Sequence, residues 1–179
     1  MINISSFLYI LTFLIGFYSN IPLSKIMLTG SDGLEYYTEA HLTKWNSNVH
    51  TICMPFSMYG LLLSIPSFFG ISSDQAKILA KCLYIFYIGH YLTLDAYVTL
   101  LYICMYYPTV KFGLNYFNNN DIINHRKSTF IKGVVISSIS LGTQELLGHY
   151  YSGDMPSRPE GVLNAILYAI YFSVHNLIN

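Results

Sequence analysis

Charged side chains are scarce in this sequence of 179 residues: Asp, Glu, Lys and Arg make up 10% of it, and the formal net charge at pH 7 is zero. The longest basic run is the pair Arg126-Lys127, so the concentrated positive charge of a nucleic-acid-binding protein is missing. Hydrophobic residues account for 53% of the chain. This composition is typical of an integral membrane protein and excludes nucleic acid as a partner.

Cysteine pairs and the common catalytic motifs are also missing. Each of the three cysteines, Cys53, Cys82 and Cys104, lies in an apolar run without C-x-x-C spacing, which argues against a disulfide framework or a zinc ribbon. The sequence lacks the G-x-S-x-G, Walker, dinucleotide-binding and H-E-x-x-H patterns. The usual hydrolase, nucleotide-binding and zinc-protease classes therefore have no support.

Long apolar segments dominate what is present. Residues 49–70 provide the roughly 20 apolar positions that a bilayer core requires, although Pro55 and Pro66 interrupt them. Residues 76–107 are too long for one membrane helix of about 1.5 Å per residue. The polar stretch 89–95 predicts a tight turn that divides them into two helices, with Thr93 available as a cap.

The remaining segments complete the expected helices. We expect the third helix to end near Tyr107, before Pro108, and we expect a polar loop at 115–128 and further helices at 130–149 and 162–178. Asn46 is the expected N-cap of the first membrane helix. The fold class predicted is therefore all-α, a polytopic integral membrane helical bundle of about four to five membrane helices plus an N-terminal apolar helix.

The N-terminal segment 1–30 is treated separately from the single helical domain 31–179. Residues 7–28 are apolar enough for a signal peptide, but they lack a positive start and a clear cleavage site. An extra membrane or interfacial helix is the favoured interpretation. A short helix is expected to begin after Ser31 or Asp32.

The topology predicts where the histidines lie. If helices cross alternately, four histidines fall on one membrane face, namely His41, His50, His90 and His149. His125 and His175 fall on the opposite face, which most of the basic residues also border, so the positive-inside rule favours a cytosolic location for that opposite face. Neutral imidazole is the commonest ligand of transition metals, so the first face is expected to hold a metal site.

Polar groups near these histidines are candidates for orienting them. Glu145 stands four residues before His149, the spacing that places both on one side of a helix, and a carboxylate there can accept the second N–H of an imidazole. Gln144 lies in the same helical turn as Glu145, and Asp154 and Glu39 are alternative carboxylates that spacing alone does not separate. Asn46 can serve both as a cap and as a support for a ligand.

Two motifs resemble a known family of membrane proteins. The first is H-x4-N-x3-H-x4-P, formed by His41, Asn46, His50 and Pro55, and the second is the pair Gly148-His149 with a glutamine shortly before it and Arg158-Pro159 shortly after. Over about residues 34–175 the chain resembles the 2-hydroxy fatty acid dioxygenase family, represented by a fungal endoplasmic-reticulum enzyme of phytosphingosine breakdown. The second motif departs from the family pattern, because Glu145 occupies the position expected for the glutamine and Gly153 or Asp154 that expected for a glutamate.

The resemblance implies an Fe(2+)-dependent dioxygenase that shortens a 2-hydroxy fatty acid by one carbon without 2-oxoglutarate. Under this hypothesis His41, His50 and His149 are the catalytic metal ligands and His90 is the candidate fourth, while Asn46, Gln144, Glu145 and Asp154 support them. The expected partners are the substrate, O2 and the lipid bilayer, and the expected location is the endoplasmic reticulum. Two alternatives stay open: a non-enzymatic metal or lipid carrier or structural subunit, and a zinc-dependent lipid hydrolase.

Overall fold

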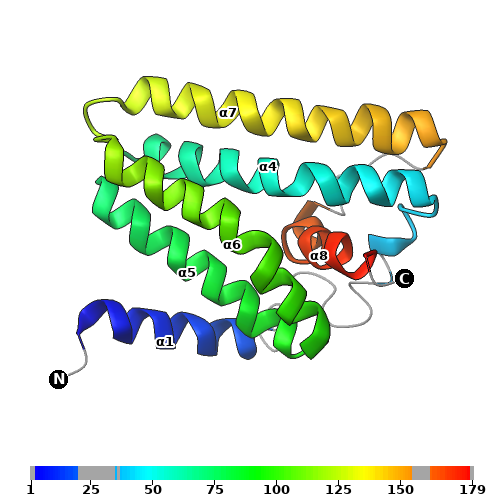
Figure 1. Ribbon diagram of the computed structural model, residues 1–179, viewed down its shortest axis with the longest axis horizontal. Coiled ribbons are helices and arrows are strands. Elements are labelled where there is room, and N and C mark those ends of the chain that lie inside the picture. The colour runs from blue at the N-terminus through cyan, green and yellow to red at the C-terminus, as the bar shows by residue number, and fades with distance from the viewer. Residues whose placement is uncertain (1–2, 20–34, 36, 155–161, 178–179) are drawn as a thin grey trace.

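The computed structural model describes residues 3–19, 35, 37–154 and 162–177, and within them the chain is helical and contains no strand (Figure 1). The main helical elements are α1 (Ile4–Phe17), α4 (Lys44–Phe69), α5 (Ser73–Leu92), α6 (Ala96–Asn119), α7 (Arg126–Thr143), the π-helical η1 (Gln144–Tyr150) and α8 (Val162–His175). The predicted all-α class is confirmed. The start of the short helix expected after Ser31 or Asp32 and the pair Arg158-Pro159 lie outside the described residues, while Glu35, Tyr37 and Thr38 of that segment are helical.

Helices α4 and α7 lie side by side in opposite directions (Figure 1), and small residues allow their close approach. A Cβ added at Gly133 would lie 2.6 Å from the Gly60 carbonyl oxygen of α4. The Ser57 and Ser140 hydroxyls are 2.7 Å apart, and Ser140 also donates to the carbonyl of Cys53 at 2.7 Å. Small residues and hydroxyl bonds between helices are typical of packing inside a bilayer. This pairing holds η1, which continues α7, beside the first turns of α4.

Replacing Gly133 with alanine should lower the free energy of unfolding by about 1–3 kcal/mol, the usual cost of overpacking. The added methyl carbon would lie 2.5 Å from the Ser64 amide nitrogen, so the two backbones must move apart. Gly142→Ala is the matched control, because a Cβ there meets nothing within 4 Å. Unfolding followed by circular dichroism in detergent checks the difference, and equal stability of the two variants would contradict this account of the helix pair.

The N-terminal apolar segment forms α1, which packs along α5. Added Cβ atoms at Gly16 and Gly89 would collide with the carbonyl oxygens of Phe86 and Phe13 respectively. At the end of α1, Ser19 Oγ lies 2.6 Å from Nδ1 of His90. The helix expected at the N-terminus is therefore present over Ile4–Phe17 and is joined to the bundle by close packing.

Buried tyrosines fill the core between α5, α6 and α8. Tyr91, Tyr102 and Tyr106 are fully buried, with ring centroids 5.2 Å apart for the first two and 5.0 Å apart for the last two. The Tyr91 hydroxyl donates to the carbonyl of Leu167 in α8 at 2.8 Å. Tyrosine hydroxyls usually find such a partner when they are buried, and this bond helps to fix α8 against the bundle.

The division of residues 76–107 into two helices is confirmed, since α5 ends at Leu92 and α6 begins at Ala96. The predicted end near Tyr107 is wrong, because α6 continues through Pro108 to Asn119. Proline removes one backbone donor and bends a helix, but packing on both sides can retain it. The N-cap of α4 is Thr43, whose hydroxyl accepts from the Asn46 amide at 3.2 Å, so the prediction of Asn46 as the cap is also wrong.

Among the described residues, α4 is the one helix long and apolar enough to cross a membrane by length and composition. Many large apolar side chains nevertheless face outward on several helices. They include Ile4, Phe7 and Ile10 of α1, Ile52, Phe56, Phe68 and Phe69 of α4, and Ile131, Val135 and Ile139 of α7. The described residues thus contain one helix of membrane-spanning length and composition, and the predicted number of four to five membrane helices is not established.

Candidate metal centre

Three histidines from separate parts of the chain meet at one end of the bundle. His41 lies in the turn before α4, His50 in the second turn of α4, and His149 near the end of η1. Their exposed fractions are 7%, 4% and 1%. One ligand nitrogen from each ring lies within 4.8 Å of the others, so the group can hold a metal ion.

The nitrogens of these rings have few other partners. His41 Nδ1 lies 2.8 Å from the Tyr37 carbonyl oxygen, which fixes the proton on Nδ1 and leaves the lone pair of Nε2 free. His41 Nε2, both nitrogens of His50 and Nε2 of His149 are buried without a hydrogen-bond partner among the described residues. An unsatisfied buried polar group costs about 1–3 kcal/mol. A metal ion could satisfy three of these atoms, one from each ring.

Burial keeps His41 in the form that binds metals. Desolvation lowers the pKa of His41 to about 4, more than its bond to Tyr37 and the nearby carboxylates of Asp154 and Glu145 raise it. The ring is therefore neutral at pH 7, and a neutral imidazole is the ligating species. Tyr37 also stacks on this ring with centroids 4.3 Å apart, so the ring is held from one face as well as through Nδ1.

Asn46 connects His149 to a carboxylate. Its Nδ2 donates to Oδ2 of Asp154 at 2.9 Å and lies 3.3 Å from Nδ1 of His149. The same Nδ2 also lies 3.3 Å from the Ala40 carbonyl oxygen, so Asp154 and Ala40 hold this nitrogen as the donor, and the buried Oδ1 has no hydrogen-bond partner among the described residues. Asn46 therefore does not cap α4 as predicted, and its side chain lies beside the three histidines instead.

Asp154 ties the start of α4 to the segment after η1. The backbone N–H and the hydroxyl of Thr43 donate to Oδ2 of Asp154 at 3.1 and 2.9 Å. Burial raises the pKa of Asp154, but the hydrogen bonds from Asn46, Thr43 and Ser152 outweigh it and hold the pKa below its ordinary value. The group is therefore a carboxylate at neutral pH, and it fixes both the cap of α4 and the Asn46 amide.

Close packing against α4 explains why the second motif has glycine at position 148. A Cβ at this position would lie 2.6 Å from Oδ1 of Asn46 and 3.5 Å from Nε2 of His50. The π-helical turn of η1 widens the backbone here and directs His149 towards α4, and π-helical turns occur often at functional sites. Trp45 fastens this turn by donating from Nε1 to the Leu147 carbonyl at 2.7 Å.

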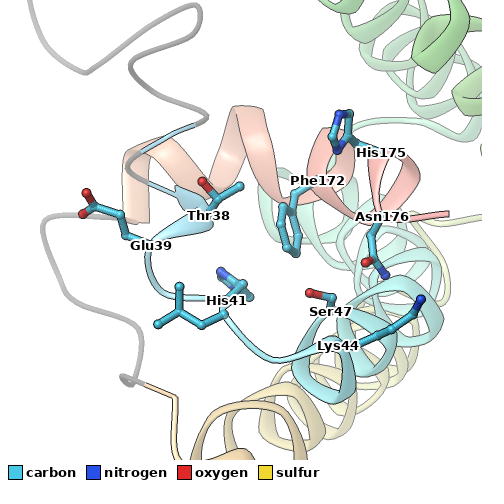
Figure 2. Close-up of a pocket in the computed structure, with 9 residues that line it drawn as sticks. Thr38, Glu39, His41, Lys44, Ser47, Phe172, His175 and Asn176 are labelled. Carbon is cyan, nitrogen blue, oxygen red and sulfur yellow. The ribbon is translucent and has the colours of Figure 1, made fainter. Parts of the chain in front are cut away.

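An open pocket of about 500 Å³ reaches the cluster from the side of His41 (Figure 2). This His41 pocket is lined by Thr38, Glu39, His41, Leu42, Lys44, Ser47, Phe172, His175 and Asn176. Its volume lies in the range of small-molecule sites, about 300–1,000 Å³. The metal-ligating group is therefore buried, yet one of its members borders a space that a ligand can occupy.

Several predicted residues lie elsewhere. His90 is fully buried but contacts Ser19, Phe86 and Tyr168 and does not belong to the group of three. Gln144 donates from Nε2 to the Ser57 hydroxyl at 3.0 Å, so it supports the α4–α7 pair. Glu145 is half-buried, and its charge acts to raise the pKa of His41 and of Tyr37. Glu39 lies on the wall of the His41 pocket.

The predicted location of His175 on the opposite face is wrong. It lines the same pocket as His41, because the end of α8 lies against the start of α4, where Asn176 donates to Asn48 at 3.3 Å. The assumption that each helix crosses the membrane in turn does not hold for a helix as short as α8, which has 14 residues (Figure 1). Sequence reasoning also missed the roles of Thr43 and Phe172. The Thr43 signal was present, since threonine is one of the residues preferred at a helix N-cap.

The chain matches no protein-family model, no curated protein and no solved structure. The geometry thus stands on its own residues: three buried imidazoles with unpartnered nitrogens, a supporting amide and carboxylate, and an adjoining pocket.

Proposed function

We propose that this protein is an Fe(2+)-dependent dioxygenase that shortens 2-hydroxy fatty acids by one carbon. The observation that carries the proposal is the convergence of His41, His50 and His149, buried, with unpartnered nitrogens. Such a donor set suits iron as well as zinc, copper or nickel. The choice of iron and of a 2-hydroxy acid rests on the resemblance of the two motifs, whose histidines, asparagine and glycine are the residues that form this cluster.

Three protein ligands leave coordination positions for other molecules. When bound there, iron would supply the redox chemistry and a point of attachment for the hydroxyl and carboxylate of the substrate and for O2. The reaction balances with O2 as the oxidant: the bond between C1 and C2 breaks, and the products are the acid one carbon shorter, CO2 and water. The two carbons lose four electrons, which is the number that one O2 accepts.

The residues of the chain hold and orient the reacting groups. The Tyr37 carbonyl keeps the His41 proton on Nδ1, so Nε2 would be free to ligate the ion. Asn46 and the Asp154 carboxylate fix the position of His149. The near-complete burial of the three rings excludes bulk water, which strengthens electrostatic interactions and limits side reactions. Phe172, whose ring centroid is 4.9 Å from that of His41, gives the substrate an apolar wall.

The proposed setting is a membrane, with the cluster close to one surface of the bilayer. Support comes from α4, which is of membrane-spanning length, and from the outward apolar side chains of α1, α4 and α7. Trp45, Tyr150 and Tyr151 are 52%, 85% and 75% exposed near the cluster, as expected of an aromatic belt at the lipid headgroups. In this setting the fatty tail stays among lipids while the polar head reaches the metal. The resemblance adds the endoplasmic reticulum as the expected membrane.

Metal content tests the proposal first. Protein purified in detergent without chelators should retain about one iron per chain, measured by elemental analysis, because three ligands are already assembled in a buried site. A folded protein that takes up no metal, even when iron is added anaerobically, would favour the non-enzymatic alternative of a lipid carrier or structural subunit. Selective retention of zinc would favour the hydrolase.

Oxygen consumption tests the chemistry. The iron-loaded protein should consume O2 with 2-hydroxyhexadecanoate and release pentadecanoate, whereas hexadecanoate should give no consumption above background because it lacks the second chelating oxygen. Mass spectrometry of the extracted acids identifies the product. Iron binding without turnover of the hydroxy acid would leave a metal-binding protein and remove the dioxygenase assignment.

A further inference from the structure

The His41 pocket has an uneven distribution of polar groups. Figure 2 shows Lys44, Ser47 and Asn176 on the side formed by α4 and the end of α8, and Glu39 on the opposite side. Phe172 lies between, and Leu42, which is 79% exposed, contributes further apolar surface. One side of the pocket therefore offers an ammonium, a hydroxyl and an amide, while the rest is largely apolar.

Lys44 contributes an ammonium group to this pocket, and this group is available to bind a ligand. The ion pair that joins two described residues, Lys77 and Asp74, does not involve Lys44. Lys44 is also the first residue of α4, where the helix dipole favours negative charge, part of which the Asp154 carboxylate already supplies through its bonds from Thr43. Both the side chain and its position thus attract an anion.

A second observation points into the same space. His41 lines the pocket, its exposed fraction is 7%, and its Nε2 has no hydrogen-bond partner among the described residues. A ligand bound in the pocket would therefore lie between the ammonium group of Lys44 and His41, one of the three clustered histidines. A molecule with a negative head and an apolar body matches both features.

We infer that the His41 pocket binds the carboxylate head of an amphiphilic acid and that Lys44 is the residue that selects for its negative charge. The inference deepens the proposed function and rests on it for the choice of a carboxylate over other anions. Lys44 acts as a specificity residue at the mouth of the site: it draws the head group out of the headgroup layer and holds it next to His41. Neutral amphiphiles such as alcohols lack this attraction and bind through the apolar wall alone.

The test measures ligand binding without turnover. Trp45, the one tryptophan in the sequence, adjoins Lys44, so quenching of its fluorescence by a brominated amphiphile reports binding near the pocket. The whole chain in nonionic detergent, treated with a chelator, is titrated with 2-bromododecanoate and with 2-bromododecanol. Variants are Lys44→Gln, Lys44→Arg and the matched control Lys127→Gln, an exposed lysine at the start of α7.

The unaltered chain should bind the acid about tenfold more tightly than the alcohol, the ratio expected from one charge-assisted contact. Lys44→Gln should remove this preference without weakening the alcohol, whereas Lys44→Arg and Lys127→Gln should retain it. An equal preference in Lys44→Gln and Lys127→Gln, or no preference in the unaltered chain, overturns the inference. Stronger displacement of the acid by dodecyl phosphate than by dodecanoate overturns the assignment to a carboxylate.

The outcome is separable from that of the proposed function. Charge selection through Lys44 is measured in chelator-treated protein, so it survives if iron or oxygen chemistry proves absent. Conversely, iron retention and O2 consumption with an unselective pocket would leave the proposed function in place and remove Lys44 from it.

Discussion

His149→Ala should abolish iron retention, with a loss of metal affinity of at least about 100-fold. Loss of a group that merely supports a ligand costs about 10–100-fold, and His149 is itself one of the three residues whose nitrogens converge. The damage should stay local, because Asn46 Nδ2 keeps its bonds to Asp154 at 2.9 Å and to the Ala40 carbonyl at 3.3 Å. Elemental analysis and anaerobic iron titration measure the loss, and circular dichroism verifies the helices.

His90→Ala is the matched control for this prediction. His90 is also a fully buried histidine with an unpartnered Nε2, but it lies beside Ser19 and Tyr168 outside the group of three. Its replacement should lower stability by about 0.5–3 kcal/mol, as a buried substitution does, and should leave iron stoichiometry unchanged. If His149→Ala keeps its iron, or if folded His90→Ala loses it, the assignment of ligands is wrong.

The sequence was informative where hydrophobic length and turn residues decide the structure. The apolar segment 49–70 is the core of α4, and the turn at 89–95 separates α5 from α6. The end of α6 could not be placed, because a proline stops a helix only when neighbouring packing does not stabilise the continuation. At Pro108, buried Tyr106 and Thr109 on either side show that tertiary packing decided the outcome.

The group of three histidines was predictable in part. His41, His50 and His149 stand in motifs that the sequence displays, and alternate helix crossing placed them on one face. That argument also placed His90 with them and His175 on the opposite face, and neither histidine lies as predicted. Crossing order states which end of a helix a residue occupies, but not the side of the helix that it faces or the tilt of a short helix such as α8. Those depend on packing between distant segments.

The supporting contacts were less accessible to sequence reasoning. Asn46 was expected both to cap α4 and to support a ligand; it does not cap the helix, and its side chain contacts Asp154 and His149, more than a hundred residues away in sequence. The carboxylate that holds it could have been Glu39, Glu145 or Asp154 by spacing alone. The π-helical geometry of η1 changes which residues share a side, so the i, i+4 relation between Glu145 and His149 no longer applies as in an α-helix.

Gly148→Ala should weaken iron binding about 10–100-fold, the range seen when the groups that orient metal ligands are disturbed. Its methyl carbon would lie 2.6 Å from Asn46 Oδ1 and 3.4 Å from Cδ2 of His50, so either η1 moves away from α4 or the amide and the imidazole shift. Both responses separate His149 from His50, whose ring centroids are 5.2 Å apart. Competition with a chelator of known affinity measures the change.

Two other alanine variants distinguish this effect from a general loosening of the helix pair. Gly133→Ala spreads α4 and α7 farther along the same interface, and it should lower stability while the affinity for iron stays within about threefold of the original, because the cluster lies several turns away. Gly142→Ala, with open space around its Cβ, should change neither property. A fall in affinity that follows stability across all three variants would mean that Gly148 acts through the fold alone. A fall confined to Gly148→Ala requires close contact between η1 and the Asn46–His50 turn, because that contact alone differs between the variants.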